Sequence, residues 1–291
     1  MSGGSRNLEM IERIDAGADR VRFVIVGDSG AWPDPTAEAV FAQLVRQTAQ
    51  LDPAPAFVAQ LGDFAGPGTR ERHERYLELV EPLGLPNICI VGNHDLDAAD
   101  GLDNFTSIHG PVNFDFAVGH TRFFAIHSEP GAVGRVAVEK PPEGTEGPRD
   151  EDLAYLDEAL TRAGEPNRIV LMHMPPYLDG HYAPHEDWGF RKREGEFLDI
   201  VRRGGVALVC CAHGLAFDHY VSDGIRFVMS GGGGTGLCSH MRGICTEGEG
   251  RPEDRGALFH AVELEVSEAG ATSGRVLQAF ARPNETRFSF G

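Results

Sequence analysis

The chain has 291 residues, of which 41% are hydrophobic and 24% charged, so it is long enough to bury a full core. Its formal net charge is −18. Such an acidic surface argues against binding to DNA, RNA or anionic membranes, because phosphate polymers are held mainly by Lys and Arg. A small anionic substrate stays compatible with this charge if metal ions reverse its sign locally.

The first 19 residues are mainly polar, and no stretch of the chain has the apolar length of a signal peptide or membrane helix. We therefore expect a polar tail over 1–19, a single domain over 20–291, and a soluble cytoplasmic protein. Cys238, His240 and Cys245 lie close together in a Gly-rich segment. Their spacing matches no standard zinc motif and a fourth ligand is missing, so whether they bind anything stays open.

Strands and helices alternate through the first part of the chain. Asp34 followed by Pro35 is typical of a helix start, since the carboxylate caps backbone amides and proline suits the first turn. Gly84 is typical of the end of a second helix. The pattern predicts strands at 21–26, 56–61 and 87–91, one helix from Asp34-Pro35 and another over 69–82.

The second part of the chain is richer in strands. The segments 112–119 and 121–127 predict a hairpin with Gly119-His120 at its turn. An amphipathic helix is predicted over 150–164, and a shorter one ends at Gly204-Gly205. Between them lies a long aromatic, histidine-rich loop at 174–194. Further strands are predicted at 168–172, 206–211, 225–230, 258–266 and 275–280, which gives one α/β domain.

Five of these strands end in a residue that can bind a metal ion. Asp28, Asp63 and Asn93 follow the first three strands, and His173 and His213 follow two later ones. Each residue alone is more often a turn former or a solvated side chain. In open α/β sheets, however, the carboxyl ends of the strands line the functional crevice. Together these five residues predict a site for a divalent transition metal.

The segments that follow the strands occur in a specific order. They are GDSG, LGDFAG, VGNHDL, LMHMPPY and AHGLAFDHYVSDGIRFVMSGGGG. In this order they resemble the calcineurin-like metallophosphoesterases, and among them the purple acid phosphatase and cyclic-nucleotide phosphodiesterase branches. The resemblance runs from about Arg22 to about Gly234. It implies an α/β fold, a four-layer α-β-β-α sandwich in which two mixed β-sheets are flanked by helices.

The resemblance also implies a role for individual residues. One metal position is complete, and Mn, Fe or Zn would suit its oxygen and nitrogen ligands. His94 would face the phosphoryl group as an acid or a hydrogen-bond donor, and Asp95 would orient it. The implied ligands of the complete position are Asp63, which bridges two metals in the family, Asn93, His173 and His213.

The other metal position has lost most of its ligands. Asp28 matches the first aspartate of the family, but Gly30 stands where many members have a histidine. Gly66 stands where purple acid phosphatases have a tyrosine, and Leu215 where most members have a final histidine. Only Asp28 and Asp63 remain, so we expect one firm metal site and a second that is weak or absent.

Other side chains near the motifs are candidates for the site. His181, His185 and Tyr177, in the aromatic loop, are candidates for the wall of a substrate pocket, and Arg191 for a phosphate contact. Ordinary loop histidines, and a solvated helix start for Arg191, are the alternatives. Replacement metal ligands could come from His127, His181, His185, Asp187, Asp218 or His219.

Hydrolysis of a phosphate monoester or diester on a small molecule is the leading hypothesis. A site with one metal and open coordination could instead run a non-hydrolytic lyase or cyclase reaction on a specialised metabolite. A third hypothesis is a non-catalytic binding module. Metal content separates them: no metal favours the binding module, one ion favours the lyase or a mononuclear hydrolase, and two ions favour a binuclear hydrolase.

Overall fold

The computed structural model describes residues 5–15, 20–128, 147–176, 189–237, 258–280 and 286–290. None of the helices in these ranges combines the length and apolar character needed to cross a membrane. In chain order the elements are α1 (Arg6–Glu12), β1 (Arg20–Val26), α2 (Pro35–Ala49), β2 (Phe57–Leu61), α3 (Arg70–Val80), the 3₁₀ helix η1 (Glu81–Leu83), β3 (Asn87–Ile90), the 3₁₀ helix η2 (His94–Leu96), α4 (Gly101–Ile108), β4 (Phe114–Val118), β5 (Thr121–Ala125), α5 (Asp150–Arg162), β6 (Asn167–Leu171), α6 (Glu194–Arg203), β7 (Leu208–Cys211), β8 (Phe217–Ser222), β9 (Ile225–Ser230), β10 (His260–Ser267), β11 (Thr272–Gln278) and β12 (Thr286–Phe290).

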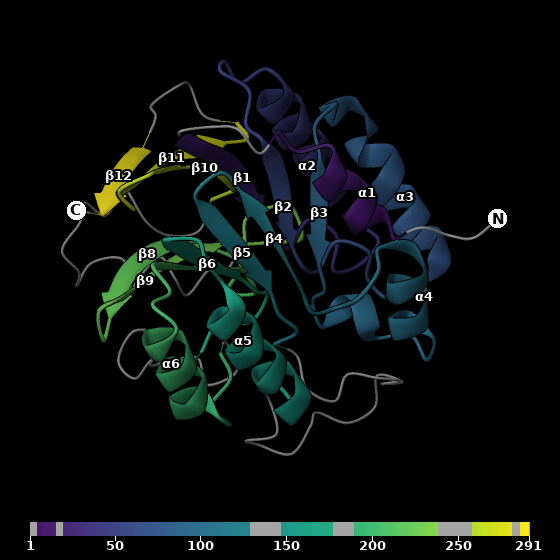
Figure 1. Ribbon diagram of the computed structural model, residues 1–291. Helices are drawn as coiled ribbons and strands as arrows, with labels where there is room; N and C mark the ends of the chain where they lie inside the picture. The colour runs from purple at the N-terminus through teal and green to yellow at the C-terminus, as the bar shows by residue number, and fades with distance from the viewer. Residues whose placement is uncertain are drawn as a thin grey trace.

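The described strands form two mixed sheets of six strands each. The first has the order β12-β11-β10-β1-β2-β3, with β1, β2 and β3 parallel to one another. The second has the order β4-β5-β6-β7-β9-β8, with β5, β6, β7 and β9 parallel. The sheets face each other, α2 and α3 lie outside the first, and α5 and α6 outside the second (Figure 1). The predicted four-layer sandwich is therefore confirmed.

The main core lies between the two sheets. Successive side chains of a strand point to opposite faces, so Phe23 of β1 enters this core whereas Val24 packs under the helices on the outer face. Phe23 and Phe57 of the first sheet meet Phe116 and Phe123 of the second, with ring centroids 5.0 to 5.4 Å apart. Each fully buried phenylalanine contributes about 1.5–3 kcal/mol to folding.

Helix α2 begins as its sequence predicts. The Asp34 side chain accepts a hydrogen bond from the Thr36 amide at 2.8 Å, and Pro35 occupies the first turn. The residues of its buried face, Ala37, Val40, Phe41, Leu44, Val45 and Thr48, are the ones that share helical spacing. This face packs on the side of β1 and β2 that points away from the inter-sheet core.

The N-terminal segment differs from the polar tail that its composition predicts. Residues Arg6–Glu12 form α1, which Ser5 caps. Asn7 is buried, and its side chain both accepts from the Cys89 amide and donates to the Cys89 carbonyl, each at 2.9 Å. Cys89 lies in β3, the edge strand of the first sheet. An edge strand leaves backbone groups unpaired, and Asn7 satisfies two of them as another strand would.

Candidate metal centre

Sharp turns at the strand ends set the direction of three predicted ligands. Asp28 after β1, Asp63 after β2 and His213 after β7 have φ values of 57°, 54° and 66°. Left-handed backbone is uncommon for residues other than glycine and is often found at functional sites. The Asp28 amide donates to the Gly62 carbonyl at 3.0 Å, and the Gly30 amide donates to the Asp63 carbonyl at 2.9 Å. The turns after β1 and β2 therefore hold each other in place.

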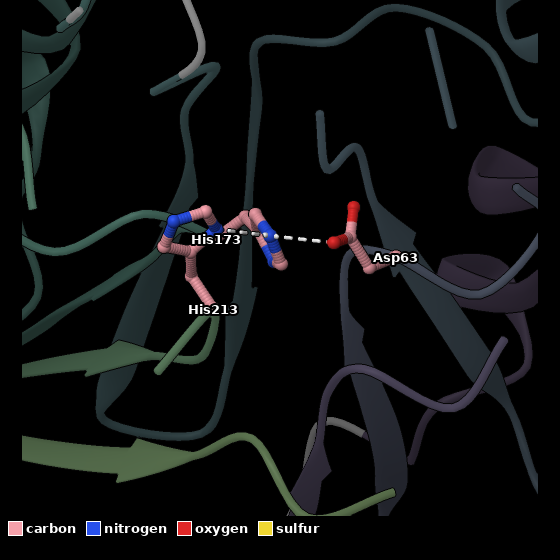
Figure 2. Close-up of side chains that lie close together, drawn as sticks. All are labelled: Asp63, His173 and His213. Atoms are coloured by element: carbon pink, nitrogen blue, oxygen red, sulfur yellow. Dashed lines mark hydrogen bonds and ion pairs between the residues drawn. The ribbon is translucent and has the colours of Figure 1, made fainter. Parts of the chain in front are cut away.

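The structure brings Asp63, Asn93, His173 and His213 together. His173 Nε2 lies 3.3 Å from Asp63 Oδ2 and 3.2 Å from Asn93 Oδ1. His213 Nδ1 lies 3.1 Å from Asn93 Oδ1 and 3.2 Å from His173 Nε2. Figure 2 shows the two imidazoles and the Asp63 carboxylate, which come from the two different sheets, converging on one another. The potential ligand atoms of Asp63, His173 and His213 lie within 4.8 Å of one another.

The donor chemistry of this cluster fits a cation. His173 Nδ1 lies 2.6 Å from the Leu61 carbonyl, so in the neutral ring Nδ1 carries the proton and Nε2 presents a lone pair. That lone pair faces oxygens of Asp63 and Asn93, which are also acceptors. Ligand atoms about 2.0–2.2 Å from a transition metal lie about 3.0–3.5 Å from their neighbours, which matches the observed spacing. A divalent ion at the centre would satisfy all of these lone pairs together.

Asp63 is the charged member of the cluster. It is 2% exposed, and its Oδ1 accepts a hydrogen bond from the His94 amide at 2.9 Å. Without a metal ion, burial raises the pKa of Asp63, but the positive charge of His173 when it is protonated and its hydrogen bond, together with the charges of His94 and His213, outweigh burial and hold this pKa below its ordinary value. The carboxylate therefore stays ionised and available to a metal at neutral pH.

Asp28 positions His213 through a hydrogen bond. Its Oδ2 accepts a hydrogen bond from the His213 amide at 2.8 Å, and the side chain is 1% exposed. Burial raises the pKa of Asp28 well above its ordinary value, and the Asp63 charge adds to that effect against the lowering by His173. Asp28 thus holds the left-handed turn that aims His213.

The other metal position keeps only two of the ligands that the resemblance implies for it, the carboxylates of Asp28 and Asp63. Backbone occupies the space where the lost ligands would project: the Gly66 amide donates to the Gly30 carbonyl at 2.9 Å. A Cβ on Gly30 would lie 2.6 Å from the Phe64 carbonyl oxygen, and one on Gly66 would overlap the Ala31 carbonyl. Within the described residues no other group of at least three His, Cys or acidic side chains converges. His127, Asp218 and His219 belong to no such group, so the described residues give no evidence that they replace the missing ligands.

Asp97, not Asp95, orients His94. His94 Nδ1 lies 2.7 Å from Asp97 Oδ2. The predicted role of Asp95 in holding His94 is wrong, because its carboxylate points the other way and accepts four backbone amides. Burial lowers the pKa of His94, but the hydrogen bond to Asp97 and the charge of Asp63 outweigh burial and raise it to about 9. His94 therefore keeps its proton at neutral pH and leaves Nε2 able to donate it.

The Asp95 carboxylate ties two ligand-bearing loops together. It is fully buried, and it accepts hydrogen bonds of 2.8–3.0 Å from the amides of Asp63, Phe64, Ala65 and Gly92. Three of these amides belong to the loop after β2 and the fourth to the loop after β3. Asp95 therefore fixes the relative position of Asp63 and Asn93 without facing the reacting groups.

The predicted substrate residues fall largely on other parts of the chain. Tyr177, His181 and His185 lie outside the described residues. Arg191 is exposed, three residues before α6 begins. Asp187 and the Cys238, His240 and Cys245 group also lie outside the described residues.

The structure adds Trp32, which the sequence analysis omits. It lies 5.0 Å from His94 between ring centroids, with the rings at 81°. The signal available in the sequence is a tryptophan in the short loop between a ligand-bearing strand end and the cap of α2.

Two facing mixed sheets with a carboxylate, a carboxamide and two imidazoles at their strand ends define a metallophosphoesterase-type protein. The model of the family described as calcineurin-like phosphoesterase matches residues 21–216, more than half of the chain. The chain belongs to the calcineurin-like phosphoesterase family.

A curated relative comes from Synechococcus sp. and is named as a probable cyclic nucleotide phosphodiesterase. It is 29% identical over 191 residues, which cover 63% of this chain and 65% of the relative. The chain thus spans slightly less than two thirds of the relative's length.

Solved structures share the fold at low sequence identity. A purple acid phosphatase from yellow lupin seeds aligns with a TM-score of 0.67 at 15% identity, covering 94% of this chain and 54% of that one. A dimetal phosphatase from Danio rerio gives 0.64 at 13%, covering 93% and 99%. GAP50, described as the anchor in the inner membrane complex of Plasmodium, gives 0.62 at 14%, covering 93% and 88%. At these identities the likeness shows the fold alone.

Proposed function

We propose that this protein hydrolyses a phosphate monoester or diester on a small molecule, using one firmly bound divalent transition metal. The observation that carries the proposal is the convergence of acceptor atoms from Asp63, Asn93, His173 and His213, which a cation would satisfy. Mn, Fe and Zn suit this mixture of oxygen and nitrogen ligands. When bound, such an ion polarises a phosphoryl oxygen and lowers the pKa of a coordinated water toward neutrality.

The chain's own residues supply the remaining parts of the reaction. His94, held by Asp97, donates a proton from Nε2 to the leaving oxygen. Asp28 keeps His213 aimed at the centre through the His213 amide. Asp95 keeps the Asp63 and Asn93 loops together. Each role keeps the donors in place before the substrate arrives, which lowers the reorganisation that the reaction requires.

A single firm metal is favoured by the backbone around the second position. Gly30 and Gly66 are packed against carbonyl groups, and Leu215 has no ligand atom. The remaining carboxylate there, Asp28, is already engaged with the His213 amide.

The substrate class follows from charge and from the relatives. The net charge of −18 disfavours nucleic-acid polymers and anionic membranes, so we place a small phosphorylated metabolite at the site. A relative named as a probable cyclic nucleotide phosphodiesterase and a structural neighbour that is a purple acid phosphatase both support ester hydrolysis at phosphorus.

Two alternatives keep the same fold. A lyase or cyclase would use the same single metal and leave phosphoesters intact. A non-catalytic module has one observation in its favour, since GAP50 shares the fold and is described as an anchor. The convergence of the donor atoms and the protonated His94 favour a catalytic function over a non-catalytic module.

Metal content and turnover of matched variants test the proposal. The purified protein, reconstituted with Mn, Fe or Zn, is expected to hold one ion per chain by elemental analysis and to hydrolyse bis(4-nitrophenyl) phosphate or 4-nitrophenyl phosphate. His213→Ala and Asn93→Ala should lose both the ion and the turnover, whereas His120→Ala, at the turn of the β4–β5 hairpin, should keep both.

The contrary results separate the alternatives. Two ions per chain would contradict the single-metal site. One ion without turnover of any phosphoester would favour the lyase or cyclase. A protein that takes up no ion, or a His213→Ala variant with full turnover, would remove the assignment altogether.

A further inference from the structure

Trp32 is an exposed aromatic residue placed beside the proposed acid. Its side chain is 47% exposed, although tryptophan usually buries most of its surface. The indole centroid lies 5.0 Å from that of His94, with the rings nearly perpendicular at 81°. Among the exposed large hydrophobic residues that the structure describes, Trp32 alone has a ring contact with a residue of the candidate site.

The backbone that carries Trp32 is held on both sides. The Ala31 amide donates to Thr235 Oγ1 at 2.9 Å, and the Gly30 carbonyl accepts from the Gly66 amide at 2.9 Å. On the other side the chain passes through Pro33 to Asp34, the cap of α2. The indole is therefore held at the rim of the site by ordered chain on each side, and it stays about half open to solvent without being part of the core.

The position of Trp32 relates it to one end of the substrate. His94 would protonate the leaving oxygen, so the group attached to that oxygen must lie beside His94 when the ester is bound. The open part of the Trp32 indole is an apolar surface in ring contact with His94. We propose that Trp32 is a specificity-determining residue, which stacks on a planar aromatic or heteroaromatic group at the leaving-oxygen end of the ester. This inference rests on the proposed phosphoesterase function.

The expected size of the effect follows from aromatic stacking. Loss of an aromatic side chain that stacks on a planar ring weakens binding by about 5- to 100-fold. A saturated ring of similar size can only make ordinary apolar contact with the indole, so it should lose about 2- to 3-fold. The quantity that tests stacking is the ratio of kcat/KM for the aromatic ester to kcat/KM for the saturated ester, not the overall rate.

Benzyl phosphate and cyclohexylmethyl phosphate form a suitable pair, because both have alkyl-type leaving alcohols and differ in the planarity of the ring. Trp32→Ala should lower kcat/KM for the benzyl ester by about 5- to 100-fold, chiefly through KM, and for the cyclohexylmethyl ester by only about 2- to 3-fold. Trp32→Phe should restore most of the preference. Phe280→Ala, which removes an exposed aromatic residue paired with Phe259, serves as the control and should leave the ratio unchanged.

The proposal is overturned if Trp32→Ala leaves the ratio of kcat/KM between the two esters unchanged. An equal loss for both esters would then mean that the indole only positions His94. If the wild-type protein hydrolyses neither of these esters nor the two nitrophenyl substrates, the phosphoesterase function fails separately. Calorimetric titration of the metal-loaded protein with the two esters then decides the role of Trp32, since a preference for the benzyl ester that disappears in Trp32→Ala supports stacking and its absence refutes it.

Discussion

Replacing Asp97 by Asn tests the electrostatic support of His94. The substitution keeps the shape of the side chain but removes the charge that lies 2.7 Å from His94 Nδ1. Burial lowers the pKa of His94, and Asp97 with Asp63 raises it to about 9 from an ordinary value of about 6.5. Because the side chains of His94 and Asp97 are 31% and 34% exposed, solvent screens part of their interaction. We expect Asp97→Asn to lower the pKa of His94 by about 1 pH unit.

The sign of the pH effect follows from the role of His94 as an acid. Activity that needs protonated His94 is present below its pKa and is lost as pH rises through that value. In Asp97→Asn the alkaline limb of kcat against pH should therefore lie about 1 pH unit below that of the wild type. Titration of the His94 ring by NMR, assigned with a His94→Gln variant, gives the same quantity without a substrate.

Asp95→Asn is the matched control at the neighbouring carboxylate. It places an amide group among four backbone donors, so it should lower the free energy of unfolding by about 3 kcal/mol or more and weaken metal retention. The pKa of His94 should stay close to its wild-type value. If Asp95→Asn moved the alkaline limb and Asp97→Asn did not, the assignment of Asp97 as the partner of His94 would be refuted.

Three further predictions concern stability and metal content. Asn7→Ala leaves the Cys89 amide and carbonyl unpaired and should lower the free energy of unfolding in urea by about 2–4 kcal/mol; an unchanged midpoint would contradict the edge-covering role of α1. The double variant Gly30→His with Leu215→His should still bind one ion per chain by elemental analysis, since backbone blocks position 30, and a second tightly held ion would show that the position can reopen. Burial lowers the pKa of His73 to about 4, so the unfolded chain takes up its proton first, near pH 6.5. The contribution of neutral His73 to the free energy of unfolding is therefore fully present above pH 6.5 and falls by about 3 kcal/mol as the pH drops toward 4. His73→Gln should make the free energy of unfolding depend less on pH between these values.

The elements that the sequence predicts well are those whose pattern is local. The apolar face of α2 and its Asp34-Pro35 start follow from spacing and capping alone. Helix α1 and the short helix α4 escape prediction because their stability depends on packing against other elements, and not on the propensity of seven or eight residues. Strand β8 had a usable signal: Asp223-Gly224 joins it to β9, both with positive φ, as in a two-residue hairpin turn.

The candidate site also has features that the sequence predicts and features that depend on the three-dimensional arrangement. Parallel strands of one sheet end at a common edge, which predicts that Asp63 lies near Asn93 and that His173 lies near His213. That the two pairs meet depends on how the two sheets face each other, which the family resemblance implies and strand order alone does not. The partner of His94 could not be read from adjacency in sequence. His94 begins the 3₁₀ helix η2, in which residues i and i+3 lie on the same side, so Asp97 faces it and Asp95 does not. Side-chain direction within a short helical turn, and not proximity along the chain, decides this pair.

Asp28 shows why a retained family residue need not report a retained metal. The carboxylate would be a ligand of the first position, yet here it accepts the amide of His213 and supports the left-handed turn that delivers His213 to the other position. Removing a buried acceptor of this kind leaves an amide unsatisfied whether or not a metal lies nearby. The complete position thus depends physically on a residue of the incomplete one. For that reason Asp28 alone carries little weight as an indication of a second ion, and the close packing of backbone around Gly30 and Gly66 leaves no room there for the side chains that supply further ligands in other family members.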